Sequence, residues 1–141
     1  MTEPHDIARA CLATHARRAS RALTRRYDRA LEPFDLRVTQ FSVLVAASLA
    51  DEEVSITDLA DVLGLERSGL SRNLGPLVRR GLIALGPESR HRARRVGLTD
   101  EGARLLAAAT PAWEAVQAET AAALPAAPAE VVATLRSLST T

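Results

Sequence analysis

Arginine, serine and asparagine side chains gather between residues 67 and 79, and these residue types suit hydrogen bonding to nucleic acid. The planar guanidinium of arginine can donate two parallel hydrogen bonds to the acceptor edge of guanine or to two phosphate oxygens. Serine and asparagine add shorter hydrogen-bonding groups beside it. A solvated helix face is the alternative, because charged residues are mostly exposed. The candidate DNA contacts of this segment are Arg67, Ser68, Ser71, Arg72, Asn73 and Arg79.

A second cationic segment spans residues 88–94 and has the composition of a mobile surface loop. An arginine on such a loop can enter a minor groove, where the potential of DNA is strongly negative. We expect minor-groove or phosphate contact for one or two of its basic side chains, with a disordered polar loop as the alternative. The candidates are Arg90, His91, Arg92 and Arg94.

The single cysteine, Cys11, lies one helical turn before His15, so the two side chains can touch. No third group that would orient such a pair for nucleophilic catalysis is visible. A small buried side chain is the favoured interpretation of Cys11, with oxidation sensing as the alternative. One cysteine excludes a disulfide framework, and the sequence has neither a glycine-rich phosphate loop nor a nucleophile elbow. We therefore expect no enzymatic activity, no cofactor and no metal.

The charges are sorted along the chain, although the formal net charge of the 141 residues is only +1 and all 18 cations are arginine. Residues 17–29 carry a net charge of +5, residues 51–63 of −5, residues 64–95 of +6 and residues 96–141 of −3. A basic surface on an otherwise acidic body follows, and it coincides with the candidate contacts. Some arginines of the first stretch are expected to meet acids of the second stretch or of a partner subunit.

Six helices are predicted from hydrophobic spacing and helix-end signals. Pro33 ends the first helix. Either Thr39 or Arg37 can cap the second, and Thr39 is the preferred one. Ser55 begins the third helix and Gly64 ends it. The fifth is expected to be interrupted or kinked near Pro111. The helices span about residues 7–31, 38–50, 55–63, 67–80, 99–124 and 129–138.

The fourth predicted helix has two faces of opposite character. Leu70, Leu74 and Leu77 lie within about 60° of each other, whereas Arg72 and Arg79 lie on the other side. Short apolar strands at 82–85 and 95–98 follow, joined by the basic loop. The order helix, turn, helix, strand, basic loop, strand is that of a winged helix-turn-helix, so the predicted fold is mainly α with a small β-wing.

The chain carries no signal for a membrane or for export. No apolar run reaches about 18 residues, and no basic stretch followed by an apolar one opens the sequence. We expect a cytoplasmic protein without a membrane partner.

The stretch from residue 10 to about residue 118 resembles the MarR family of bacterial ligand-responsive transcriptional regulators. Its matching segments stand in family order and at family spacing over more than two-thirds of the chain. They are RRASRALTR (17–25), YD (27–28), TQF (39–41), ITDLA (56–60), LGL (63–65), LSRNL (70–74), Leu77, GLI (81–83) and RRVGLTDEG (94–102).

The resemblance implies an obligate homodimer held by the first and the last two helices. It also implies a winged domain that binds a pseudo-palindromic operator in double-stranded DNA. Residues 1–34 and 100–141 would then be dimerisation regions, and residues 35–99 the DNA-binding domain.

The resemblance further implies a small-molecule or redox signal that changes the spacing of the two winged domains. The family's effector pocket lies between the dimer helices and the winged domain, where Arg18, Tyr27 and Trp113 are candidates; core packing is the alternative for the aromatic residues. The expected function is a sequence-specific DNA-binding regulator, a repressor whose DNA affinity an effector lowers. The alternatives are a winged-helix protein-interaction module and a redox-responsive regulator that uses Cys11.

Three positions depart from the family pattern. Arg90 stands where many members have an aspartate before an arginine pair, which predicts a looser and more basic wing. Pro76 lies inside the candidate contact helix and removes the donor to the carbonyl of Arg72, which predicts a bend there. Ala13 occupies the position of the reactive cysteine of peroxide-sensing relatives, two residues from Cys11.

Overall fold

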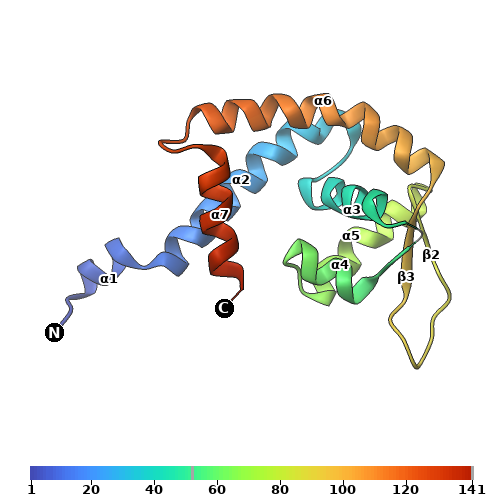
Figure 1. Cartoon of the computed structure of the whole chain (residues 1–141), viewed down its shortest axis with the longest axis horizontal. Coiled ribbons are helices and arrows are strands. Elements are labelled where there is room, and N and C mark those ends of the chain that lie inside the picture. Colours follow the sequence, from blue (N-terminus) through green and yellow to red (C-terminus); the bar gives the residue numbers. More distant parts are fainter. Residues whose placement is uncertain (52, 141) are drawn as a thin grey trace.

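The computed structural model describes residues 1–51 and 53–140, so Glu52 and Thr141, which fall in the predicted regions 35–99 and 100–141, lie outside the described residues. The predicted fold, mainly α with a small β-wing, is confirmed (Figure 1). The elements are α1 (Pro4–Ala10), α2 (Leu12–Leu31), the 3₁₀ helix η1 (Glu32–Phe34), α3 (Val38–Leu49), β1 (Val54–Ser55), α4 (Ile56–Leu63), α5 (Arg67–Arg79), β2 (Ile83–Leu85), β3 (Arg95–Leu98), α6 (Asp100–Ala122) and α7 (Pro128–Ser139).

The molecule is elongated, with the wing at one end and the two chain termini toward the other (Figure 1). Helix α6 runs from the end of β3, packs along α2 and leads to α7. No helix among the described residues is both long enough and apolar enough to cross a membrane.

Helices α4 and α5 form the predicted helix-turn-helix. Ser55 Oγ accepts a hydrogen bond from the Asp58 N–H over 3.1 Å, which caps α4 as its sequence signal indicates. Gly64 has a left-handed backbone with a φ of 65°, and this conformation ends α4 and allows the short turn into α5.

The wing is part of a three-stranded antiparallel sheet in the order β1-β3-β2. Strands β2 and β3 match the two predicted strands, and Ile83 pairs with Leu98. Strand β1 was not predicted, because its two residues show no alternation and are defined only by pairing with β3, where Val54 lies opposite Val96.

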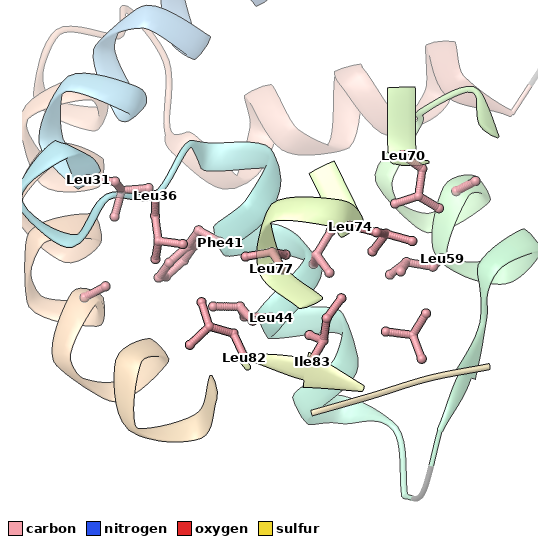
Figure 2. Close-up of a cluster of buried hydrophobic side chains, with 14 residues drawn as sticks. Leu31, Leu36, Phe41, Leu44, Leu59, Leu70, Leu74, Leu77, Leu82 and Ile83 are labelled. Atoms are coloured by element: carbon pink, nitrogen blue, oxygen red, sulfur yellow. The ribbon is translucent and has the colours of Figure 1, made fainter. Parts of the chain in front are cut away.

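The core lies where α3, α4, α5 and β2 meet (Figure 2). Leu70, Leu74 and Leu77 are buried on the inner face of α5, which confirms that prediction. They pack among side chains that include Phe41 and Leu44 of α3. Burying each leucine contributes about 1.5–3 kcal/mol, so this face fixes which side of α5 points outward.

Three predictions about the helices are wrong in detail. The single helix expected over 7–31 is broken at Cys11, whose extended backbone (ψ 105°) closes α1 and opens α2. The interruption that was one of the two alternatives near Pro111 does not occur: α6 is continuous from Asp100 to Ala122, and the carbonyl of Ala107, which loses its helical donor at Pro111, belongs to an exposed residue.

The third concerns Thr39, which is not the cap of α3 but its second residue. Arg37 holds the cap position, and its N–H donates to Gln40 Oε1 over 3.0 Å. Asp28 Oδ1, from α2, accepts from the Val38 N–H over 2.7 Å. The capping groups therefore come from α2 and from within α3, which a search for a local Ser or Thr cap does not detect.

Candidate nucleic-acid interface

The outer face of α5 is polar, basic and exposed. Five of the sequence-predicted contacts are exposed on α5, and Ser68, Arg72 and Arg79 among them lie opposite its leucines. The five are Arg67, Ser68, Ser71, Arg72 and Arg79. They lie on the same helix as the buried leucines, so the core determines which side of α5 is turned to solvent. A helix with a small, polar and basic outer face fits the major groove of DNA, which is about 12 Å wide.

Glycines let the arginines lie close to the helix surface. A Cβ built at Gly75 would come within 3.3 Å of Arg79 Nη1, which is tighter than most real contacts. A Cβ at Gly69 would lie 4.0 Å from Arg72 Nη2. The small residues therefore leave room for the guanidinium groups along α5.

Asn73 differs from the other predicted contacts because it is half-buried and turned toward α3. Its Oδ1 accepts a hydrogen bond from Thr39 Oγ1 over 2.9 Å, and its Nδ2 donates to the Gly69 carbonyl over 2.8 Å. The structure thus separates Asn73 from the five exposed side chains with which the sequence grouped it.

The wing also divides into two parts. Arg90, His91 and Arg92 are exposed at its tip, where the His91 N–H donates to Ser89 Oγ over 3.2 Å. Arg94 instead braces the base of the loop: its Nε donates to the Gly86 carbonyl over 2.7 Å, and its Nη1 lies 3.5 Å from Glu88 Oε1. Within residues 1–51 and 53–140, the basic side chains at the tip have no ion pair, whereas Arg94 at the base has one.

Sequence reasoning did not single out two arginines that tie separate elements together. Arg95 Nη2 donates to the Glu53 carbonyl over 2.7 Å and ties β3 to the start of β1. Arg80, just after α5, donates to the carbonyls of Asp35 and Phe34 over 2.6 and 3.1 Å. Arg80 and Arg95 bind backbone carbonyls that are distant in sequence, so no local pattern predicts these contacts. The one hint in the sequence is that each follows a predicted contact, Arg79 or Arg94.

The three effector-pocket candidates have different surroundings. Arg18 is exposed on α2. The Tyr27 hydroxyl donates to Gln117 Oε1, which joins α2 to α6. Trp113 stacks on Phe41 with a ring-centroid distance of 6.4 Å. These contacts give both aromatic residues a packing role.

Two open cavities lie beside α2 instead. One, of about 710 Å³, is bordered by α2, η1, the start of α3 and the end of α5. Its charged residues are the arginines Arg25, Arg29, Arg37 and Arg80 and the acids Asp28, Glu32 and Asp35. The other, of about 940 Å³, lies between α2 and α6. Arg25 and Arg29 line both cavities, so the basic stretch 17–29 supplies their shared wall. In the part of the chain that the structure describes, no ion pair joins this stretch to the acids of 51–63.

Cys11 lies at the break between α1 and α2 and is only partly buried. The pKa of its thiol is lowered, first by the hydrogen bond that Thr14 Oγ1 donates to Sγ over 3.3 Å, then by backbone N–H groups and the charge of Arg17. His15 Nε2 lies 2.9 Å from the Arg9 carbonyl and makes its hydrogen bond there. No cluster of metal ligands occurs within residues 1–51 and 53–140.

The comparisons with known proteins agree with this geometry. The MarR family model matches residues 34–95. The crystal structure of the M. tuberculosis transcriptional regulator MosR is 36% identical and superposes with a TM-score of 0.82, covering 92% of this chain and 93% of that chain. The structure of MosR in complex with DNA is 38% identical with a TM-score of 0.80 and the same coverage.

A third structure is a ligand complex. CouR from Rhodococcus jostii RHA1 bound to p-coumaroyl-CoA is 26% identical with a TM-score of 0.73, covering 92% of this chain and 88% of that chain. No curated protein sequence matches the chain.

Proposed function

Because the chain belongs to the MarR family of transcriptional regulators, we propose that it represses transcription by binding an operator as a homodimer and that a small-molecule effector relieves the repression. One observation carries the DNA-binding part: the exposed basic face of α5 stands opposite a buried leucine face. MosR, the relative solved in complex with DNA, has this fold over nearly the whole chain.

In the proposed complex α5, the recognition helix, enters the major groove. Arg72 and Arg67 donate to guanine edges or phosphates there, and Ser68 and Ser71 add shorter hydrogen bonds. Arg90 and Arg92 at the wing tip reach the adjacent minor groove. A protein-interaction surface would be more apolar and less charged than this face.

A second copy of the chain would bury the exposed apolar side chains of the helical arms. We use this name for α1, the first half of α2 and α7. The exposed fractions are 55% for Ile7, 71% for Leu12 and 50% for Leu135, and these apolar side chains recur on the arms. We assign dimerisation to residues 1–34 and 100–141 and DNA binding to residues 35–99. Two-fold symmetry then predicts operator half-sites about one helical turn apart.

The proposed effector site is the cavity of about 710 Å³ between α2 and the winged region, by which we mean residues 35–99. Its four arginines come from α2, the N-cap of α3 and the C-cap of α5, and they outnumber its three acids, so a ligand whose anionic group lies at the arginines contacts both parts whose spacing must change. The ligand of CouR, p-coumaroyl-CoA, supports a small-molecule effector. A ligand that prefers the arrangement unable to bind DNA lowers DNA affinity by population shift.

The experiment that tests this function is selection of DNA from a random pool by the purified protein. We expect one enriched sequence with two-fold symmetry, bound by a dimer with an affinity that falls steeply as salt rises. A pool without an enriched sequence, or a monomer on the DNA, would contradict the proposal. A transcription assay with the selected site upstream or downstream of a promoter then distinguishes repression from activation.

A redox signal at Cys11 is the second candidate, and the lowered pKa of its thiol favours it. The test compares DNA affinity before and after treatment with hydrogen peroxide, with Cys11→Ser as the control. A loss of affinity in the wild type that Cys11→Ser prevents would support this candidate, and equal affinities would reject it.

A further inference from the structure

Two side-chain hydrogen bonds join the middle of α5 to the start of α3. Thr39 Oγ1 donates to Asn73 Oδ1, and Asn73 Nδ2 donates to the Gly69 carbonyl. We propose that Asn73 is a positioning residue, which sets the rotation of α5 on α3 and thereby the direction of Arg72. This inference rests on the proposed function, since it concerns how the DNA-contacting face is aimed.

The apolar contacts of α5 leave this rotation incompletely defined. Leu70, Leu74 and Leu77 hold the helix against the core, but hydrophobic contact is not directional. A hydrogen bond weakens steeply when its angle departs from linearity. The two bonds of Asn73 therefore add the angular restraint that the leucines do not supply.

Pro76 makes such a restraint necessary. Because proline has no N–H, the carbonyl of Arg72 receives no helical hydrogen bond from residue 76. Helix α5 is thus weakest at the turn just after its exposed Arg72. The Asn73 bonds lie at this turn and hold its N-terminal side through the Gly69 carbonyl.

The other end of the connection is firmly held. The Val38 N–H donates to Asp28 of α2, and the Arg37 N–H donates to Gln40, so the start of α3 is fixed on both sides of Thr39. The hydrogen bond from the Thr39 hydroxyl to Asn73 therefore orients α5 relative to the fixed start of α3.

The first test uses Thr39→Val, which removes the hydroxyl and keeps the shape of a residue that is not on the outer face of α5. Its affinity is measured for the DNA site that the wild type selects and for a scrambled duplex. We expect the affinity for the selected site to fall about 3- to 10-fold, the effect of one hydrogen bond. The affinity for scrambled DNA and the salt slope should stay unchanged, since no phosphate contact is lost. Thr39→Ser, which restores the donor, should bind like the wild type.

A mutant cycle with Asn73→Ala separates positioning from base contact. If both residues act through one bond, the double variant binds the selected site no more weakly than Asn73→Ala alone. An Asn73→Ala effect confined to one base pair, with a silent Thr39→Val, would overturn the proposal. So would an equal loss on both DNAs.

Hydrogen exchange gives a readout that needs no DNA. Thr39→Val should speed amide exchange in residues 69–73, while the fluorescence of Trp113, the single tryptophan, stays unchanged because its stacking on Phe41 is intact. Unchanged exchange would overturn the proposal, and so would altered Trp113 emission, which reports general loosening. If the wild type selects no DNA sequence, the proposed function fails while the exchange result still decides whether the bond restrains α5.

Discussion

The outer face of α5 in the winged region, residues 35–99, and the helical arms differ in the apolar side chains that they leave exposed. In the winged region the leucines of α5 are buried and its outer face is basic, whereas the arms expose Ile7, Leu12 and Leu135. A buried core with a polar exterior needs no partner, whereas repeated exposed apolar side chains indicate a surface that a partner buries. The two surfaces should therefore respond to different substitutions.

The largest effect is expected in the core of the winged region. Leu77 is fully buried, so Leu77→Ala should lower the free energy of unfolding by about 2–5 kcal/mol. Its control is Arg79→Ala, two residues along the same helix and exposed, which should change stability by less than about 0.5 kcal/mol. Urea unfolding of both variants measures the difference, and similar losses would mean that the two faces of α5 are not distinct.

A charge on the arms should act on assembly and not on folding. Leu135→Asp places a carboxylate on α7 at a side chain that is 50% exposed. Burial of the leucine by a partner would contribute about 1 kcal/mol, roughly half of the value for full burial. We expect dimer dissociation at higher protein concentration in sedimentation runs, together with weaker operator binding. Leu49→Asp is the matched control, because Leu49 is 79% exposed but belongs to the winged region. Dissociation by the control, or none by Leu135→Asp, would contradict the assignment of the arms.

A change on the outer face of α5 should act on DNA and leave both stability and assembly intact. Arg72→Ala should weaken binding of the selected site by about 1–3 kcal/mol and relax the preference at one base pair. Binding titrations on single-base variants of the site, at one salt concentration, measure both effects. A variant that binds like the wild type would remove Arg72 from the proposed contacts.

The two regions also differ in how far sequence predicts them. Helix α5 is predictable because its leucines repeat at helical spacing and because Gly64 marks the turn before it. What sequence reasoning missed depends on partners far along the chain. Strand β1 is defined only by its pairing with β3. Asn73 turns inward because Thr39, 34 residues earlier, supplies a hydrogen-bond donor. A periodic pattern gives the face of a helix, but it does not tell which polar residue at its edge is bonded inside.

Substitutions in the wing should have the smallest effect on DNA affinity, and they distinguish its tip from the rest of the proposed DNA-binding surface. Arg90 and Arg92 are exposed at its tip, so the double variant Arg90→Ala/Arg92→Ala should weaken binding to all sequences alike. Each lost phosphate contact lowers the salt slope by about 0.9, so a decrease of up to about 2 is expected in titrations over several salt concentrations. Arg104→Ala, an exposed arginine paired with Glu101 on α6, is the control and should leave the slope unchanged. A loss confined to sites with a narrow A·T-rich flank would instead show that the tip recognises groove shape, because a narrow minor groove concentrates the negative potential that attracts an inserted arginine.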